Sequence, residues 1–393
     1  MISEEEARAK ILEMVRPLPA RSSSILHVLD CFAAEDYFAR VPLPNFDNSA
    51  MDGYAVVANS CAPGKRLRVI GEQPAGLDRQ LRVASAEAVR VFTGAPLPAG
   101  ADAVVMQEDV VRDGTEIIVN LDVDVGEFVR KRGCDLGEGQ KILAAGERIR
   151  PAVLALLASQ GFVDVPVGGE VNAAVISTGD ELVNPGEPLQ PGQIYESNST
   201  LLRALLQTCG AHVRSAQHCR DDQDCLTEAL KRNVIHHVVI ITGGVSVGEH
   251  DLVQSVLRSL GAKIDIWRVA IKPGKPFLFG QIGDCVVFGL PGNPVSAYVT
   301  FLQFVRPAIL KMMGASKSEL ELPKTLARLT VDLRNEGGRP HYIRGRLENG
   351  EFTPVGRQES HALFGLSQSN ALLRLAAGES RKRNAIVDVE ISD

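Results

Sequence analysis

The stretch VVIITGGVSVGEHD, residues 238–251, decides the fold predicted for this chain. Its first four residues are an apolar, β-branched run of strand length. The turn that follows is rich in small residues, namely Thr242, Gly243, Gly244, Ser246 and Gly248. Such a turn lets backbone N–H groups approach phosphate oxygens closely, and the next helix adds positive potential at its N-terminus. The stretch therefore predicts a strand, a phosphate-binding turn and a helix, although a plain tight turn that needs glycine fits the same residues.

Carboxylates accompany this glycine-rich turn and a second one. Glu249 and Asp251 close the first stretch, and the segment ISTGDE at 176–181 ends in Asp180 and Glu181 after another strand-like run. The loops at the carboxyl ends of strands in an α/β sheet meet in one crevice. We therefore predict that Glu181 and Asp251 share a Mg²⁺ ion, because Mg²⁺ takes one or two carboxylates plus phosphate oxygens. Solvated turn residues are the alternative for the Asp-Glu pair.

Two further loops in the same region carry groups suited to an anion. IKPGKPFLFG places Lys272 and Lys275 around a Pro-Gly turn, and two ammonium groups on a stiff turn suit a negatively charged ligand. GLPGNPVSA places Pro291 and Pro294 between a strand and a helix, where Pro294 fits the first helical turn. An exposed loop and a rigid turn are the alternatives. Because four such loops occur in one region, we predict a shared site for an anionic ligand.

The order of apolar runs indicates the architecture. From residue 171 to about 314, strand and helix patterns alternate, which favours a layered α/β domain with a mostly parallel sheet. Residues 54–150 show short strands separated by Gly and Pro, and residues from about 325 onward return to strand character. Helices are expected over 24–34 and, with Pro at its start and Gly at its end, over 151–161.

Composition limits the classes of function. The chain has 393 residues, of which 45% are hydrophobic and 23% charged, and its net charge is −6. This charge disfavours nonspecific nucleic-acid binding, and one Trp with five Tyr are too few for a base-stacking surface. No apolar stretch reaches the length of a membrane span, and the N-terminal MISEEEARAK lacks the apolar core of a signal peptide. Seven scattered cysteines without a C-x-x-C favour reduced thiols, so a cytoplasmic protein is expected.

The strand-rich region carries charged loops of its own. Asp52 lies in DNSAMDGYA, and Thr93 begins TGAPLPAGADAVV after a strand. Arg130 opens the run RKRGCD, which ends in Asp135. Basic groups beside carboxylates suit a charged substrate, but most such runs are solvated surface, so the pattern alone leaves both interpretations open.

Together these motifs resemble the molybdopterin molybdenumtransferase family, which includes bacterial MoeA and the E domain of animal gephyrin. The resemblance rests on eight motifs in the family's order between about residues 44 and 307: DNSAMDGYA, TGAPLPAGADAVVMQE, RGCD, STGDEL, GQIYESN, ITGGVSVGEHD, IKPGKPF and GLPGNPVSA. It implies an elongated multidomain α/β subunit with a three-layer molybdopterin-binding domain. The implied domains are an N-terminal/linker domain (1–43 and 141–170), an inserted β-rich domain (44–140), the α/β domain (171–318) and a C-terminal β-barrel (319–393).

The resemblance also implies a reaction. Adenylylated molybdopterin and molybdate are the substrates, Mg²⁺ is the cofactor, and AMP is released as molybdenum cofactor forms. Family members are homodimers whose active site lies between the α/β domain of one subunit and the inserted domain of the other. A transient contact with the molybdopterin adenylyltransferase is also expected.

Matching positions carry implied roles. The catalytic set is Asp52, Thr93, Asp135, Glu181, Asp221 and Asp251, with Glu181 and Asp251 as metal ligands. The substrate-binding set is Arg130, Gly243, Gly244, Ser246, Lys272, Lys275, Pro291, Pro294, Arg344 and Ser360.

Two alternatives remain at this point. One is a non-catalytic dimeric scaffold of the gephyrin E-domain type, and the other is the related adenylyltransferase, which shares the α/β domain. The presence of both Glu181 and Asp251 favours turnover over the scaffold. The inserted and C-terminal domains argue against the adenylyltransferase.

Overall fold

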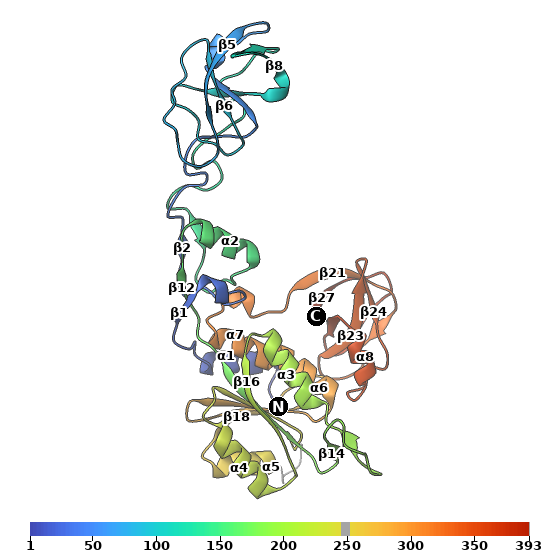
Figure 1. Cartoon of the computed structure of the whole chain (residues 1–393). Coiled ribbons are helices and arrows are strands. Elements are labelled where there is room, and N and C mark those ends of the chain that lie inside the picture. Colours follow the sequence, from blue (N-terminus) through green and yellow to red (C-terminus); the bar gives the residue numbers. More distant parts are fainter. Residues whose placement is uncertain (245–251, 393) are drawn as a thin grey trace. The chain divides into compact units, whose positions relative to one another are not determined.

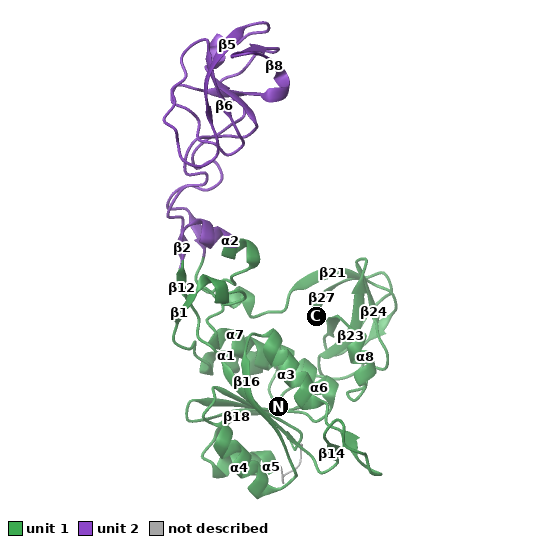
Figure 2. Ribbon diagram, in the orientation of Figure 1, with its two compact units in different colours: residues 1–35, 144–154, 163–393 green, residues 36–143, 155–162 purple. Residues whose placement is uncertain are grey.

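The computed structural model describes residues 1–244 and 252–392, which fall into two compact units (Figure 2). Unit 1 comprises residues 1–35, 144–154 and 163–393, and unit 2 comprises residues 36–143 and 155–162. Ser246 and Asp251 lie outside the described residues, so their roles stay predictions. The division into four domains likewise stays a prediction.

A six-stranded sheet in the order β16-β13-β17-β20-β19-β18 organises the described part of unit 1 (Figure 1). Its strands are β13 (Asn172–Thr178), β16 (His212–Cys219), β17 (Val238–Thr242), β18 (Lys263–Arg268), β19 (Pro276–Ile282) and β20 (Cys285–Leu290). The first four strands in this order are parallel, and β19 and β18 are antiparallel to their neighbours. Every residue of β17 is buried, as expected for a parallel strand covered on both faces. The predicted, mostly parallel sheet is confirmed.

Helices cover both faces of this sheet. The covering helices are α1 (Glu4–Met14), α3 (Asn198–Thr208), α4 (Gln223–Asn233), α5 (Leu252–Ser259), α6 (Pro294–Thr300) and α7 (Arg306–Met312), with a π-helical turn, η4 (Phe301–Val305), between α6 and α7. Side chains alternate along each strand, so Val238 and Ile240 pack in the cluster that holds α3 and α6. Val239 and Ile241 pack with α4 and α5 on the other face. The result is the predicted three-layer arrangement (Figure 1).

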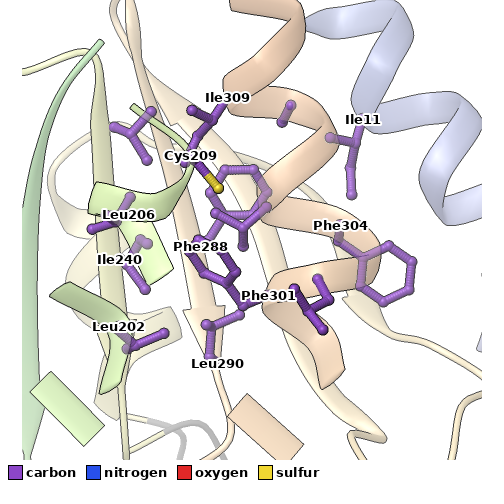
Figure 3. Packing of buried hydrophobic residues seen from close by; sticks show 14 of the residues in the cluster. Ile11, Leu202, Leu206, Cys209, Ile240, Phe288, Leu290, Phe301, Phe304 and Ile309 are labelled. Atoms are coloured by element: carbon purple, nitrogen blue, oxygen red, sulfur yellow. The ribbon is translucent and has the colours of Figure 1, made fainter. Parts of the chain in front are cut away.

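The larger core lies on the α3–α6 face. Figure 3 shows Leu202 and Leu206 of α3 with Ile240 and Phe288 of the sheet, and Phe301 packs in the same cluster. All five side chains are fully buried. At about 25 cal/mol per Å² of apolar surface, this burial is the main force that holds the helices on the sheet.

Local capping explains where several helices begin. The Ser3 side chain and Glu6 form a capping box at α1. Asp222 Oδ1 accepts a 2.8 Å hydrogen bond from the Cys225 N–H at the start of α4, and Pro294 stands in the first turn of α6.

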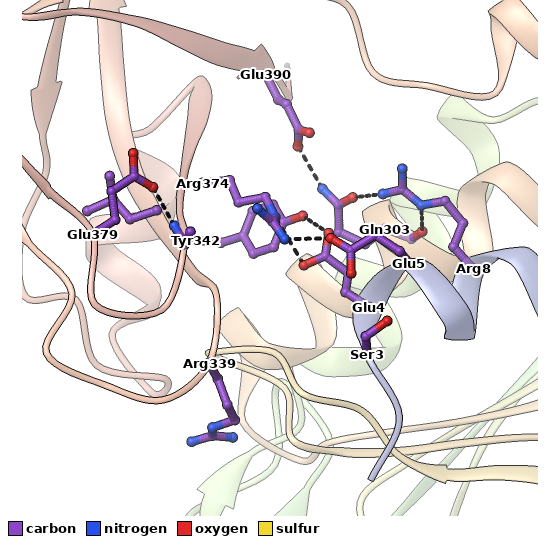
Figure 4. A network of polar contacts seen from close by, with 12 residues as sticks. Ser3, Glu4, Glu5, Arg8, Gln303, Arg339, Tyr342, Arg374, Glu379 and Glu390 are labelled. Carbon is purple, nitrogen blue, oxygen red and sulfur yellow. Dashed lines mark hydrogen bonds and ion pairs between the residues drawn. The ribbon is translucent and has the colours of Figure 1, made fainter.

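A closed barrel follows the α/β layers within the described residues of unit 1. Its strands, in barrel order, are β21 (Lys324–Leu329), β24 (Glu351–Pro354), β23 (His341–Glu348), β25 (Ala371–Leu375) and β27 (Ile386–Ile391). Smaller elements are β22 (Leu333–Arg334), α8 (Leu363–Ser367) and β26 (Ser380–Arg381). A polar network joins the barrel to α1: buried Glu4 accepts hydrogen bonds from the Tyr342 hydroxyl and from Arg374 Nε, at 3.3 Å (Figure 4).

Unit 2 contains a second six-stranded sheet, counted over the described ranges, in the order β7-β4-β6-β5-β9-β8. Its strands are β4 (Gly53–Val56), β5 (Arg66–Gln73), β6 (Glu87–Val91), β7 (Ala103–Met106), β8 (Val110–Asp113) and β9 (Glu116–Val119). Short pairs join β2 (Tyr37–Phe38) to β11 (Lys141–Leu143) and β3 (Asn48–Ser49) to β10 (Val129–Arg130). The predicted β-rich character of this segment is confirmed.

The helix expected over 24–34 is wrong, whereas the helix expected from residue 151 is present as α2 (Pro151–Ser159). Instead, β1 (Arg21–Ser24) pairs with β12 (Asp164–Val167), and only a short 3₁₀ turn follows it. The N–H groups of Asp30 and Ala33 bond to the carbonyls of Ile149 and Glu147. Because these donors bond to a distant segment, a continuous helix cannot form there. The remaining short pair is β14 (Leu182–Val183) with β15 (Ile194–Tyr195).

Candidate active site

A cavity of about 530 Å³ lies at the carboxyl ends of β13 and β17 in unit 1. Two strand ends and the loop after β16 contribute Ser177, Thr178, Gly179, Glu181, Asp221, Thr242, Gly243 and Gly244. Other segments contribute Leu182, Ile194, Tyr195, Glu196, Ser197, Asn198, Gly292, Asn293, Pro294, His361 and Leu363. Five residues given roles from the sequence therefore share one cavity: Glu181, Asp221, Gly243, Gly244 and Pro294.

Glycine is required where the β13 and β17 loops meet. Gly243 and Gly244 have φ values of +85° and +61°. A Cβ atom at Gly243 would lie 2.2 Å from the Thr178 carbonyl oxygen, and one at Gly244 would lie 2.6 Å from Thr178 Oγ1. The backbone of this turn therefore packs directly on the neighbouring strand end, and small residues keep the cavity open beside it.

The cavity is acidic. The Asp221 N–H donates a 3.2 Å hydrogen bond to Asp180 Oδ1, which holds two carboxyl-bearing loops together. Burial raises the pKa of Asp221, and the negative charges of Asp180 and Glu181 raise it further. Such crowding of negative charge is relieved by a bound cation.

The donor set fits a Mg²⁺ ion. Within the described ranges, no three His, Cys, Asp or Glu side chains are grouped so as to hold a metal alone. Mg²⁺ does not need such a cage, because it takes one or two carboxylates and completes its shell with phosphate oxygens and water. Buried side-chain atoms of the lining residues include Ser177 Oγ and Asn198 Oδ1, neither of which has a hydrogen-bond partner in the described structure. These atoms and the crowded carboxylates are consistent with a polar ligand and its metal.

Asn198 holds three segments together at the cavity. No role was predicted for it from the sequence beyond its place in the motif GQIYESN. Its Nδ2 donates to Thr242 Oγ1 at 2.9 Å and to the Gly292 carbonyl at 2.7 Å. Thr242 Oγ1 in turn donates to the Pro291 carbonyl at 3.2 Å. Nearby, Glu196 Oε1 accepts a 2.8 Å bond from the Ser199 N–H at the start of α3. Asn198 is the first residue of α3, and a polar residue at the expected start of a helix was the available signal in the sequence.

The two predicted lysines lie on the turn that leads into β19. Lys272 and Lys275 are exposed, and neither is among the described residues that line the cavity. Gly274 between them packs on α6, where an added Cβ would lie 2.5 Å from Thr300 Cγ2. The Lys272 carbonyl accepts a 2.8 Å bond from the Tyr342 N–H of β23. The lysine turn therefore stands between α6 and the barrel.

Arg344 lies on β23 and Ser360 lies on the loop between β24 and α8. Both take part in hydrogen bonds that hold this loop in place. Arg344 is 1% exposed, and its guanidinium donates to the carbonyls of Ala362 at 2.8 Å, Glu359 at 3.2 Å and Arg357. The Ser360 carbonyl accepts a 3.1 Å bond from the Val295 N–H in α6. The guanidinium of Arg344 thus supports the loop that carries His361 and Leu363 into the cavity lining.

The charged motifs of unit 2 also come together. Asp52 Oδ1 accepts 2.8 Å hydrogen bonds from both the N–H and the hydroxyl of Thr93. These bonds lower the pKa of Asp52, so this exposed carboxylate is ionised at neutral pH. Arg130 lies in β10, which pairs with β3 of the Asp52 motif. Asp135 lies further along the same segment, where its N–H donates to the Leu43 carbonyl at 3.0 Å.

Three family descriptions match nearly the whole chain in order. Residues 2–161 match the MoeA N-terminal region (domain I and II), residues 174–311 a probable molybdopterin binding domain, and residues 326–391 the MoeA C-terminal region (domain IV). A molybdopterin molybdenumtransferase of Haemophilus influenzae is 38% identical over 385 residues, which are 95% of this chain and 94% of the relative. The chain belongs to the molybdopterin molybdenumtransferase family.

Other members of the molybdopterin molybdenumtransferase family agree with this assignment. The Nostoc sp. member is 38% identical over 373 residues, 90% of this chain and 85% of the relative. The crystal structure of the molybdopterin biosynthesis MoeA protein from Pyrococcus horikoshii OT3 is 30% identical with a TM-score of 0.86, covering 100% of both chains. The predicted family and fold class are confirmed, and the chain is an enzyme of molybdenum cofactor biosynthesis. Within the described residues, no helix combines the length and apolar character needed to cross a membrane.

Proposed function

We propose that this enzyme inserts molybdate into adenylylated molybdopterin and releases AMP, in a Mg²⁺-dependent reaction at the unit 1 cavity. One observation carries the proposal: glycine turns and carboxylates from neighbouring strand ends line the same 530 Å³ cavity. Glycine turns at the carboxyl ends of parallel strands suit a phosphate ester, because they offer backbone N–H groups without side-chain bulk.

The carboxylates have distinct roles in this proposal. Glu181, together with Asp251 outside the described residues, would hold Mg²⁺, and Asp221 adds negative charge beside them. When bound, Mg²⁺ supplies Lewis-acid polarisation of the phosphate oxygens. The chain itself orients the substrate: Asn198 fixes the Thr242 and Gly292 segments, and the Gly243–Gly244 turn approaches the ligand through its backbone.

We also propose a homodimer in which Asp52, Thr93 and Arg130 of one subunit serve the cavity of its partner. The support is that Asp52 is exposed, ionised and held by Thr93, although such a pair contributes little to folding by itself. A cytoplasmic location is part of the proposal, because all seven cysteines, which lie in the described ranges, are free thiols. A transient contact with the adenylyltransferase would deliver the substrate.

An omission experiment tests the proposed reaction. Purified enzyme receives adenylylated molybdopterin with molybdate and Mg²⁺, and each component is left out in turn. AMP is measured by chromatography, and product cofactor by activation of an apo-molybdoenzyme. The proposal requires that AMP and active cofactor form together only in the complete mixture. AMP release at the full rate without Mg²⁺ would refute the metal requirement, and no AMP in the complete mixture would refute the reaction.

A further inference from the structure

The cavity has an uneven distribution of charge. Its lining includes three carboxylates, Glu181, Glu196 and Asp221. Among the described residues that line it, His361 is the only one with a basic side chain. A substrate that carries phosphate groups, or the molybdate dianion, would meet net repulsion from this lining. A hydrogen-bond donor that faces such an anion would offset part of this repulsion.

His361 is presented by a loop held on two sides. Arg344 donates to the carbonyls of Glu359 and Ala362, which flank His361, and α6 binds the Ser360 carbonyl. Gln358 adds a further brace, since its Nε2 donates to the Arg344 carbonyl at 3.0 Å. The backbone at His361 is thus fixed by tertiary hydrogen bonds rather than by a helix or strand.

In the described part of the chain, the contact of the His361 side chain with Glu359 gives it no structural role that accounts for this bracing. Its Nε2 lies 3.5 Å from Glu359 Oε2, but the two side chains are 70% and 54% exposed. Exposed pairs of this kind add little to stability. Because the side chain is exposed, the ring can face a ligand without breaking a buried contact, and an imidazole keeps an N–H donor in both its neutral and its protonated form.

We propose that His361 is a substrate-binding residue of this cavity, whose ring N–H donates a hydrogen bond to a tetrahedral oxyanion, either the adenylyl phosphate or molybdate. This inference rests on the proposed function. It also explains why Arg344 is buried, since its guanidinium positions His361 by holding the loop carbonyls. Arg344 and Ser360, to which the family resemblance gives roles, then act beside a third residue to which it gives none.

Calorimetric titration tests this role without turnover. AMP and sodium molybdate are titrated separately, in the presence of Mg²⁺, into wild type, His361→Ala, His361→Gln and the control His212→Ala. His212 is a matched control because it is half exposed and lies 3.8 Å from Glu170, at the opposite end of β16 from the cavity. Thermal unfolding of each variant checks that the fold is intact.

Loss of one hydrogen bond to a charged ligand predicts about 10-fold weaker binding of one anion by His361→Ala. His361→Gln should recover most of the affinity, since its amide keeps an N–H donor, and His212→Ala should match wild type. A change for AMP alone assigns His361 to the phosphate, and a change for molybdate alone assigns it to the metal oxyanion. In turnover assays the Ala variant should raise the KM of the corresponding substrate, adenylylated molybdopterin for AMP or molybdate itself, more than it lowers kcat.

Several results would overturn the inference. These are unchanged affinity of His361→Ala for both anions, equal weakening by the Ala and Gln variants, equal weakening by His212→Ala, and no binding of either anion to wild type. Failure of the proposed function looks different: wild type would bind AMP in a His361-dependent way yet release none from the adenylylated substrate.

Discussion

The backbone N–H of Asp221 donates a 3.2 Å hydrogen bond to Oδ1 of Asp180, and this bond joins the loop after β16 to the loop after β13. Glu181, the next residue, lines the cavity together with Asp221. Negative groups are thus held close together by the backbone itself. The arrangement costs electrostatic energy in the free protein, which a bound cation would recover.

Glu181→Gln should reduce the rate of AMP release roughly 100-fold, because it removes a negative ligand from the electrostatic stabilisation of the phosphate. The variant should also need more Mg²⁺ for half-maximal activity. Glu187→Gln is the matched control, since Glu187 is an exposed glutamate on the same β14–β15 segment and outside the cavity lining. A Mg²⁺ titration of both variants decides the assignment, and equal curves for Glu181→Gln and wild type would remove Glu181 from the metal site.

Gly243→Ala should destabilise unit 1 by about 1–3 kcal/mol and abolish substrate binding, because φ is +85° and the added methyl would lie 2.2 Å from the Thr178 carbonyl oxygen. Gly192→Ala is the control. Gly192 also has a positive φ, +90°, but no atom lies within 4 Å of its added Cβ. Urea unfolding measures both. If the two variants lose the same free energy of unfolding, the close approach of the β17 turn to β13 does not add to the cost of the substitution.

Mixing inactive Asp52→Ala with inactive Asp251→Asn should restore activity if each site draws on two subunits. Random exchange makes half of the dimers mixed, and each mixed dimer holds one intact site of two, so about a quarter of wild-type activity is expected. Subunit exchange is verified with differently tagged copies. No recovery after verified exchange, or a monomer at the assay concentration, would contradict the shared site.

Lys275→Gln should raise the concentration of molybdate or of adenylylated molybdopterin needed for half-saturation by about 10-fold. This is the value for one lost charge-assisted hydrogen bond at an exposed position. The effect should shrink at high salt, because exposed charges are screened. Lys263→Gln, which alters an exposed lysine at the start of β18, is the control. Unchanged half-saturation for both ligands in a Lys272/Lys275 double variant would make the turn a plain exposed basic loop.

Glu390→Gln tests the buried polar network of the barrel. Burial raises the pKa of Glu390, although the hydrogen bond from Gln303 and the charge of Arg8 oppose this shift. A carboxyl with a raised pKa stabilises the fold below its unfolded pKa and loses this contribution as the pH rises through the folded value. The variant keeps an acceptor for Gln303 Nε2, which lies 2.7 Å from the present carboxylate.

We therefore expect the free energy of unfolding of Glu390→Gln to rise relative to wild type as the pH increases from about 4 to 7. Urea unfolding at several pH values measures the difference. Glu348→Gln, an exposed glutamate on β23, should show no such trend. If the difference in the free energy of unfolding between Glu390→Gln and wild type stays constant with pH, Glu390 has the same pKa in the folded and the unfolded chain.

The sequence predicts those parts of the fold whose signal is local. β17 and its turn follow from an apolar run and two glycines, and α2 follows from Pro151 and Gly161. The helix expected over 24–34 is wrong because its partner is distant: residues 21–24 pair with residues 164–167, far away in the chain.

The candidate site likewise contains residues that a local sequence pattern predicts and residues whose role depends on distant contacts. Glu181, Asp221, Gly243 and Gly244 line the cavity because each follows the end of a strand in one sheet. The bracing role of Arg344 could not be predicted, since its partners are carbonyls 13 to 18 residues away in an irregular loop. His361 likewise has no sequence pattern that marks it. Its place depends on how the barrel packs beside α6.

The central claim is that AMP release is coupled to molybdate insertion at the unit 1 cavity. The most direct measurement follows one reaction with adenylylated molybdopterin, Mg²⁺ and limiting molybdate, and quantifies AMP and pterin-bound molybdenum in the same samples. We predict that both products rise together in a constant ratio and stop when molybdate is exhausted. AMP that continues to form after molybdate is exhausted, or molybdenum bound to the pterin without AMP release, would contradict the claim.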